Sequence, residues 1–357
     1  MKIVTIVGAR PQFIKAAVVS RAIKKEKSIQ EIIIHTGQHF DRNMSDIFFE
    51  QMHIPHYNYN LNISNLPHGA MTGRMLEEIE KVLLKEKPDV ILVYGDTNST
   101  LAGALAAKKM HIKIAHVEAG LRSFNIAMPE EINRIITDRI SDILFCPTQS
   151  AVENLEKEGF DAMDCIINNC GDVMLDAFLY YNSYAQKPNI TIPDKFALCT
   201  IHRVENTENK DNLFGIFAAL EAISNEIPII LPLHPKTKAK LKEFQYDFNT
   251  SKLTSIDPVS YFEMLYLLKQ CQMAITDSGG LQKESYFAQK RCLVLRNETE
   301  WTELVTSHAV TLAGTKTNNI ISAFQNTYNI SIDFSKKLYG NGNAGNLIVE
   351  QLAKLFD

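Results

Sequence analysis

The chain has 357 residues, and at roughly 150 residues per domain this length predicts about two domains. Its hydrophobic fraction of 45% and charged fraction of 22% are typical of a folded globular protein and exclude a disordered one. Lys and Arg number 37 and Asp and Glu 41, which gives a net charge of −4. A balance so near neutrality excludes charge-driven binding to nucleic acid or to an anionic membrane as the main function.

The sequence has no pattern typical of a membrane span, a signal peptide, a disulfide framework or a zinc site. No apolar run approaches the roughly 20 residues of a membrane span, and Arg10 interrupts the first apolar run too early for a signal peptide. We therefore expect a cytoplasmic protein without a membrane segment. The six cysteines form no Cys-x-x-Cys pair, so their spacing favours neither a disulfide framework nor a zinc site.

Short apolar runs alternate with longer helical segments along the chain. In residues 71–87, for example, Met75, Ile79 and Leu83 recur at helical spacing among charged residues. This alternation predicts βαβ units, in which parallel strands form a sheet covered by helices on both faces. The expected strands are residues 2–8, 32–34, 90–94, 112–117, 143–146, 197–201, 227–233, 273–276 and 292–295.

A domain boundary is expected near Gly171, with the two domains joined within residues 171–190. A helical stretch follows to about Asn182, then a segment without periodicity that contains Pro188 and Pro193, and a second βα series begins at Phe196. The sequence therefore predicts an α/β protein with two Rossmann-like, doubly wound parallel-sheet domains, in residues 1–170 and 171–344.

Polar residues gather directly after the apolar runs. They are 8–10, 35–39, 95–96, 118, 202–203, 234 and 277–280. In open α/β sheets, ligands bind beyond the carboxyl ends of the strands. Because these groups come from both halves of the chain, we expect a cleft between two facing domains.

The segment 277–284 follows one of these strands and reads Asp-Ser-Gly-Gly-Leu-Gln-Lys-Glu. Gly279 and Gly280 at a strand-to-helix turn let a phosphate approach the backbone N–H groups at the helix N-terminus. Glu284, one helical turn after Gly280, is placed either to accept hydrogen bonds from a ribose diol or simply to face solvent. The whole segment is also compatible with a capped helix start that binds no ligand.

Residues 340–345 match the Gly-x-Gly-x-x-Gly dinucleotide fingerprint letter for letter. No clear strand precedes them, and no strand can follow to carry the acidic residue that this fingerprint requires. We therefore predict a turn before a terminal helix, and no nicotinamide cofactor.

Three carboxylates at neighbouring strand ends are candidates for general acid and base. Asp96 is otherwise a favoured helix N-cap, and Glu130, after Pro129 in a first helical turn, is otherwise a dipole-favourable charge. Glu118 stands where an apolar residue would have served. As a set, these three favour catalysis.

Cationic residues lie at the same predicted rim: Arg10, Lys15, Arg122, His202 and Arg203. They are able to bind an anion such as a diphosphate, although each one alone is equally compatible with a solvated or paired surface group. His234, before Pro235, either contacts a nucleotide or shapes a turn. His35, His39, His116 and His234 show no metal-ligand spacing, so no metal site is expected.

Taken together, these residues resemble the non-hydrolysing UDP-N-acetylglucosamine 2-epimerases. The resemblance is carried, in the family's order, by Gly-Ala-Arg-Pro at 8–11 with Lys15, His-Thr-Gly-Gln-His at 35–39, Gly-Asp-Thr at 95–97, His-Val-Glu-Ala-Gly-Leu-Arg at 116–122, Pro-Glu-Glu-Ile-Asn-Arg at 129–134, His-Arg-Val-Glu-Asn at 202–206 and the segment 277–284. It spans nearly the whole chain.

The resemblance implies a GT-B-type fold, a homodimer and a final helix, 345–357, that crosses back to complete the first domain. It implies C2 epimerisation that interconverts UDP-GlcNAc and UDP-ManNAc for surface polysaccharide synthesis, by elimination of UDP to a 2-acetamidoglucal and re-addition, without a cofactor. Position by position, the acid/base groups are Asp96, Glu118 and Glu130. His202, which also counts among the expected catalytic residues, and Arg10 contact the diphosphate leaving group, with Lys15 nearby. Ser278, Gly279 and Gly280 hold the phosphates, and Glu284 binds the ribose. Arg122, Arg203 and His234 complete the expected substrate site.

The sequence departs from the family at 300–303, where Glu-Trp-Thr-Glu replaces the common Glu-Arg-Pro-Glu. Trp301 resembles the branch that acts on UDP-2,3-diacetamido-2,3-dideoxyglucuronic acid, which is the second candidate substrate. Phe40-Asp41 and residues 65–69 also differ from members that bind a second UDP-GlcNAc as an activator. The same nucleotide cleft is also compatible with a GT-B glycosyltransferase or with a hydrolysing epimerase, which the motifs favour less.

Overall fold

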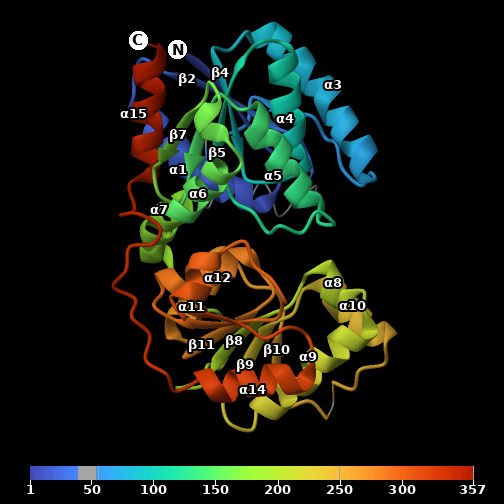
Figure 1. Cartoon of the computed structure of the whole chain (residues 1–357). Coiled ribbons are helices and arrows are strands. Elements are labelled where there is room, and N and C mark those ends of the chain that lie inside the picture. The colour runs from blue at the N-terminus through green and yellow to red at the C-terminus, as the bar shows by residue number, and fades with distance from the viewer. Residues whose placement is uncertain (39–53, 55, 249, 357) are drawn as a thin grey trace. The chain divides into compact units, whose positions relative to one another are not determined.

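The computed structural model describes residues 1–38, 54, 56–248 and 250–356, apart from the side chains of Arg10 and Phe356. The chain forms two compact units (Figure 1). Unit 1 comprises Met1–Leu179 and Lys337–Asp357, and unit 2 comprises Tyr180–Lys336.

Unit 1 is built on a parallel sheet of seven described strands, in the order β3-β2-β1-β4-β5-β6-β7. The strands are β1 (Lys2–Val7), β2 (Gln30–His35), β3 (Tyr59–Asn60), β4 (Val90–Tyr94), β5 (Lys113–Val117), β6 (Ile143–Cys146) and β7 (Ile166–Asn169). The helices are α1 (Arg10–Ile23), α3 (His68–Glu86), α4 (Asn98–Lys109), α5 (Pro129–Ile140), α6 (Gln149–Lys157), η1 (Phe160–Ala162), α7 (Val173–Tyr181) and α15 (Ala344–Phe356). Helices α3, α4 and α5 cover one face of this sheet, and α1 and α15 the other (Figure 1).

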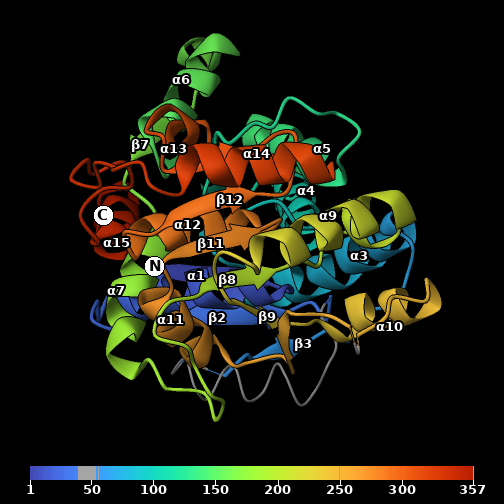
Figure 2. The same ribbon diagram turned by 90° about the horizontal axis from the view of Figure 1, so that it is seen from below.

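Unit 2 repeats the same winding with six described strands, in the order β10-β9-β8-β11-β12-β13. The strands are β8 (Ala197–Thr200), β9 (Ile229–Pro232), β10 (Thr254–Ile256), β11 (Met273–Thr276), β12 (Arg291–Val294) and β13 (Val310–Leu312). The helices are η2 (Asn182–Tyr184), α8 (Val204–Thr207), α9 (Lys210–Ile223), α10 (Pro235–Glu243), α11 (Tyr261–Gln270), α12 (Gly279–Phe287), α13 (Thr302–Thr306) and α14 (Thr317–Thr327). Helix α14 lies beside α9, as Figure 2 shows from below.

The predicted fold, two Rossmann-like parallel-sheet domains of the GT-B type, is confirmed. All the described strand pairs are parallel. The central strand Val90–Tyr94 is buried along its whole length, which explains its continuous apolar run, because helices cover both faces of such a sheet. The strands β3, β7, β10 and β13 were not predicted.

The chain leaves unit 1 after Leu179, which lies within the segment 171–190 where the two domains were expected to join. Most of α7 stays with unit 1, where Asp176 accepts a hydrogen bond from the N–H of Gly345 at 2.9 Å. The chain returns at Lys337, and the N–H of Asp172 donates to the carbonyl of Tyr339 at 3.0 Å. Two segments far apart in sequence thus join beside α7.

The terminal segment agrees with the prediction made for it. Residues 340–343 form a turn, with positive φ angles of 83° at Gly340 and 74° at Gly342, and α15 follows. This last helix packs against α1, where a Cβ on Gly345 would lie 2.7 Å from a methyl group of Val18. In the described part of the chain, no helix is both long and apolar enough to span a membrane.

Candidate active site

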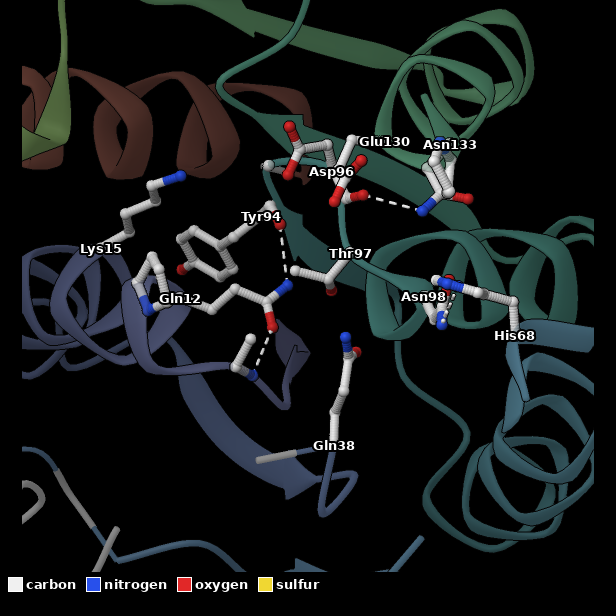
Figure 3. A pocket seen from close by; sticks show the side chains of 14 residues that line it. Gln12, Lys15, Gln38, His68, Tyr94, Asp96, Thr97, Asn98, Glu130 and Asn133 are labelled. Atoms are coloured by element: carbon white, nitrogen blue, oxygen red, sulfur yellow. Dashed lines mark hydrogen bonds between the residues drawn. The ribbon is translucent and has the colours of Figure 1, made fainter. Parts of the chain in front are cut away.

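A pocket in unit 1 lies at the point where the strand order reverses, between β1 and β4. Rossmann-like sheets bind their ligands at such a point. The pocket has a volume of about 210 Å³ and is shown in Figure 3. Its lining residues are Ala9, Pro11, Gln12, Lys15, Gln38, His68, Tyr94, Gly95, Asp96, Thr97, Asn98, Pro129, Glu130 and Asn133.

Gln12 ties the two strand ends of this pocket together. Its Oε1 accepts from the N–H groups of Gly8 at 2.8 Å and Ala9 at 2.9 Å, after β1. Its Nε2 donates to the carbonyl of Tyr94, at the end of β4, at 2.8 Å, and to Thr100 at 3.0 Å. Gln12 is almost fully buried, so the pocket floor is a fixed hydrogen-bonded frame.

Two of the predicted carboxylates, Asp96 and Glu130, line the pocket together (Figure 3). Asp96 does not cap α4, because Thr97 does so and accepts from the N–H of Thr100. The side chain of Asp96 instead pairs with Arg134 at 2.6 Å, and its carbonyl accepts from Asn133 at 2.8 Å. Helix α5 begins at Pro129, as predicted, and places Glu130 in its first turn.

The neighbouring Glu131 is turned away into a buried structural role. Its carboxylate accepts from the N–H groups of Ser123 at 2.9 Å and Phe124 at 2.8 Å and pairs with Arg134 at 2.6 Å. Burial acts to raise its pKa, but these N–H groups and Arg134 outweigh burial and hold the pKa below its ordinary value. The position of Glu130 in the pocket supports its choice over Glu131.

The lowered pKa of Glu131 predicts how replacing it changes acid stability. Since its pKa is lower in the folded state, ionised Glu131 stabilises the fold above about pH 4.5, the ordinary value, and that contribution is lost as the pH falls through the folded-state pKa. We expect Glu131→Gln to be less stable than wild type at pH 7 and the gap to narrow below pH 4.5. Urea unfolding between pH 7 and pH values below 4.5 measures the difference in unfolding free energy between the two proteins. A difference that does not change with pH would contradict a lowered pKa of Glu131.

Glu118, the third predicted carboxylate, reaches the same region through an ion pair with Lys15. Both residues are 8% exposed, and Lys15 lines the pocket. Glu118 has a φ angle of +74°, a left-handed conformation that is unfavourable for a side chain. The adjacent turn requires Gly95, with φ +62°, since a Cβ there would lie 3.0 Å from Lys15 Nζ and 3.1 Å from Glu118 Oε2.

The backbone conformation of Glu118 can be tested by comparing Glu118→Gly with Glu118→Ala. Both variants lose the pair with Lys15, so their difference isolates the backbone. A glycine relieves about 1–2 kcal/mol of left-handed strain but loses about 0.4–1 kcal/mol through the greater freedom of the unfolded chain. We therefore expect Glu118→Gly to be the more stable by about 0.5–1 kcal/mol in urea unfolding. At Glu153, inside α6, the substitution to Ala should instead give the more stable variant and the substitution to Gly the less stable one.

Arg122, predicted to bind substrate, does not line this pocket. Its side chain is 1% exposed. The guanidinium donates to Asp138 at 2.7 Å, to the carbonyl of Leu121 at 2.7 Å, and to both carboxylate oxygens of Glu158 at 2.7 and 2.8 Å. The buried contacts of Arg122 therefore favour a structural role beside the strand ends over contact with a ligand.

The predicted residues of unit 2 also gather at a strand-order reversal, between β8 and β11. Asp277, fully buried, accepts from the backbone N–H groups of His202 at 3.1 Å and Arg203 at 3.0 Å, and from Asn206 at 3.0 Å. The imidazole of His202 lies 3.4 Å from the same carboxylate and is 44% exposed. The organising role of Asp277 was not predicted, because a carboxylate at a strand end is not distinctive in sequence.

Ser278 caps α12 and accepts from the N–H of Leu281 at 3.4 Å. The two glycines that follow differ in their surroundings. A Cβ on Gly279 would lie 2.3 Å from Glu300 Oε1 and would make that carboxylate shift, whereas a Cβ on Gly280 would meet only Ser278 Oγ at 3.8 Å. Packing therefore does not explain Gly280, whose backbone remains open to a close-approaching group.

The other predicted nucleotide contacts occupy different settings. Glu284 is buried rather than facing solvent. The pKa of Tyr261 is raised well above its ordinary value, first by burial and then by the charge of Glu284. His234 caps α10, where its Nδ1 accepts from the N–H of Lys236 at 3.2 Å, which matches the turn-shaping interpretation.

The segment that departs from the family pattern packs against α12. Trp301 is 3% exposed, and the ammonium of Lys283 lies 3.9 Å from the centre of its ring. Glu300 pairs with Arg296 at 3.1 Å. The position of Trp301 therefore lies beside the helix start that was predicted to bind phosphate.

Some predicted features lie outside what the structure describes: the side chain of Arg10, together with His39, Phe40 and Asp41. Among the described residues, no group of three or more His, Cys, Asp or Glu side chains is arranged to hold a metal ion.

Known proteins are similar to this chain over nearly its whole length. The sequence profile of the family described as UDP-N-acetylglucosamine 2-epimerase matches residues 21–353. A UDP-2,3-diacetamido-2,3-dideoxy-D-glucuronate 2-epimerase of Pseudomonas aeruginosa is 53% identical, over 99% of this chain and 100% of that protein. The crystal structure of Methanocaldococcus jannaschii UDP-GlcNAc 2-epimerase in complex with UDP-GlcNAc and UDP is 43% identical, with a TM-score of 0.92, over 99% of this chain and 100% of that one. The Neisseria meningitidis enzyme bound to UDP-GlcNAc is 31% identical, with a TM-score of 0.87, over the same shares.

Proposed function

The chain belongs to the UDP-N-acetylglucosamine 2-epimerase family, and we propose that it inverts C2 of a UDP-linked N-acetylated hexosamine. It is an isomerase, as predicted. The observation that carries the proposal is the pocket at the β1–β4 reversal, where Asp96 and Glu130 lie together and Lys15 brings in Glu118. An epimerase needs these proton carriers but no sugar acceptor, which distinguishes it from a glycosyltransferase.

The proposed reaction avoids a free carbanion at C2. One carboxylate removes the C2 proton, the C1–O bond to the diphosphate breaks, and a double bond forms between C1 and C2, which gives a 2-acetamidoglycal and UDP. A proton then returns to C2 from the opposite face, and the diphosphate oxygen re-forms the bond to C1. Asp96, Glu118 and Glu130 are the proposed proton carriers, since carboxyl groups in different surroundings can divide into acid and base.

We propose that unit 2 binds the UDP part of the same substrate. The N-terminus of α12, with Ser278, Gly279 and Gly280, supplies N–H groups and a positive dipole end for a phosphate. His202, Arg203, Lys15 and Arg10 are the proposed cations for the charge that develops on the departing diphosphate. Glu284 is the proposed ribose contact, and His234 a contact at the nucleotide.

For the sugar, we propose 2,3-diacetamido-2,3-dideoxyglucuronic acid as the preferred form. The support is the 53% identical relative of that activity together with Trp301, which packs beside the α12 start. UDP-GlcNAc is the second candidate, because the structures at TM-scores of 0.92 and 0.87 belong to UDP-GlcNAc epimerases. Either product would serve the synthesis of a surface polysaccharide.

A substrate panel tests this choice. Each UDP-sugar is incubated with the protein at equal concentration, and the C2 epimer is quantified by ion-pair chromatography and NMR. We expect kcat/KM for the diacetamido uronate to exceed that for UDP-GlcNAc by more than about tenfold, which is about 1.4 kcal/mol of transition-state discrimination. The reverse order assigns the protein to UDP-GlcNAc, and release of free sugar instead of an epimer would indicate a hydrolysing enzyme.

We also propose a cytoplasmic homodimer. The described cysteines are all free thiols, which fits a reducing compartment, and the dimer rests on the family resemblance. Light scattering of the purified protein measures the assembly directly.

A further inference from the structure

Next to Gly95, which lines the pocket, unit 1 buries a histidine and a carboxylate that the proposed chemistry does not use. His116 lies in β5 and Asp138 near the end of α5, and both side chains are 0% exposed. Nδ1 and Oδ1 lie 2.6 Å apart, a contact that we call the His116–Asp138 pair. Taking two such groups out of water is costly unless every polar atom finds a partner, so the partners show what the pair holds in place.

The first partner is the turn that carries Asp96. His116 Nε2 lies 2.7 Å from the carbonyl oxygen of Gly95. The two ring nitrogens thus contact two different elements, the carboxylate of Asp138 in α5 and the carbonyl of Gly95 after β4. Gly95 has a positive φ angle and lies past the end of β4, where a buried carbonyl needs a partner from outside the strand ladder.

The second partner is the turn that follows Glu118. The other carboxylate oxygen of Asp138 accepts from the N–H of Gly120 at 3.1 Å and from Arg122 at 2.7 Å. Gly120 has a φ angle of +80°, so this N–H also lies outside the sheet ladder. One histidine–carboxylate pair therefore binds the backbone beside both strand-end carboxylates.

Helix α5 connects the same pair to the third carboxylate. Glu130, Arg134 and Asp138 follow one another at intervals of four residues, which places them on one face of the helix. Arg134 holds the side chain of Asp96 and Asn133 holds its carbonyl. The helix that carries Glu130 is thus hydrogen-bonded to Asp96 itself and, through Asp138, to the turns beside Asp96 and Glu118.

We propose that the His116–Asp138 pair is a positioning device for the reaction, which fixes the strand-end turns of Asp96 and Glu118 to α5 and so sets the spacing of the three carboxylates. The inference rests on the proposed function. Neither residue touches substrate. Its effect is geometric: proton transfer requires close alignment, and a misplacement of about 1 Å can cost about 10²-fold in rate.

Two substitutions at His116 separate its two contacts. The amide of Asn replaces Nδ1 and keeps the contact to Asp138, whereas the amide of Gln reaches the position of Nε2 and keeps the contact to Gly95. We expect His116→Asn to lower kcat by roughly 10²-fold and His116→Gln by only about tenfold, with KM and UDP affinity within about twofold of wild type. A purely structural histidine would lower the amount of folded protein without this order in kcat.

Asp138→Asn is compared with a matched carboxylate-to-amide change at Glu31. Glu31 lies in the same unit at the start of β2 and does not line the pocket, and its carboxylate accepts from Thr5 at 2.6 Å and Ser20 at 2.9 Å. We expect Asp138→Asn to lower kcat at least about tenfold more than Glu31→Gln. If Asp138→Asn does not fold, the kcat values of the two His116 variants still test the proposal.

Amide hydrogen exchange gives a readout independent of turnover. Residues 95–97, whose turn loses the contact from the position of Nε2, should exchange faster in His116→Asn than in Glu31→Gln, while β4 keeps its protection. Unchanged protection at residues 95–97, or kcat values of the His116 variants no lower than that of Glu31→Gln, would overturn the proposal. A wild-type protein without epimerase activity contradicts the proposed function instead, and the exchange experiment still decides whether the pair fixes the turns.

Discussion

Replacement of Asp96 by Asn is expected to lower turnover by about 10²- to 10⁴-fold, the usual range for loss of a positioned general acid or base. Asp96 lines the pocket with Glu130, and its carboxylate is held by Arg134 at 2.6 Å. An amide has nearly the same shape but cannot carry the proton. Because the proposed UDP contacts of unit 2 are untouched, UDP affinity should stay within about twofold of wild type, which calorimetry can measure.

The matched control is Asp89→Asn. Asp89 precedes the same strand, β4, at its other end, where its carboxylate accepts from the N–H of Lys2 at 2.6 Å. This variant carries the same chemical change on the same strand and should retain nearly full turnover. If Asp96→Asn also kept its turnover, or if the two variants lost the same amount, Asp96 would not be a proton carrier.

The second large effect is expected in stability. Arg122→Met should lower the free energy of unfolding by about 3–5 kcal/mol, because it leaves buried Asp138 without the guanidinium that pairs with it. Burial acts to raise the pKa of Asp138, but His116 and Arg122 together hold it below its ordinary value, so the carboxylate stays charged in the core. A loss of this size is a large share of the roughly 5–15 kcal/mol that stabilises a typical domain.

Arg139→Met is the matched control for this variant. Arg139 is exposed on α5, the helix that carries Asp138, with its guanidinium 5.3 Å from the ring centre of Phe160, and its loss should cost about 0.5–1 kcal/mol. Urea unfolding measures both variants. The experiment also separates two roles for Arg122: if it bound substrate, as its motif indicated, Arg122→Met would raise KM with little loss of stability.

The central strands were predictable because burial on both faces leaves a continuous apolar run, as in Val90–Tyr94. Strands at the sheet edges were not. Tyr59–Asn60 and Thr254–Ile256 are short and partly exposed, so they carry no apolar run and no measurable alternation. The extent of α7 within unit 1 was likewise hidden, since it depends on the contact of Asp176 with Gly345, which lies far along the chain.

The positions of the candidate residues were more predictable than their contacts. The ends of parallel strands lie at one edge of the sheet, which predicts Asp96 beyond β4, and Pro129 predicts Glu130 in the first turn of α5. The left-handed conformation of Glu118 was not predictable, because glutamate carries no signal for a positive φ angle. Neither was the burial of Arg122, since the sequence does not show that Asp138 and Glu158 surround its guanidinium.

The central claim, that these carboxylates invert C2 of a UDP-sugar, is tested most directly by incubation in D₂O. NMR follows deuterium at C2 of UDP-GlcNAc and of its 2,3-diacetamido uronic counterpart. The wild-type protein should incorporate deuterium at C2 together with formation of the C2 epimer, and Asp96→Asn should do so about 10²- to 10⁴-fold more slowly. Absence of deuterium from C2 of both sugars with the wild-type protein would contradict the account.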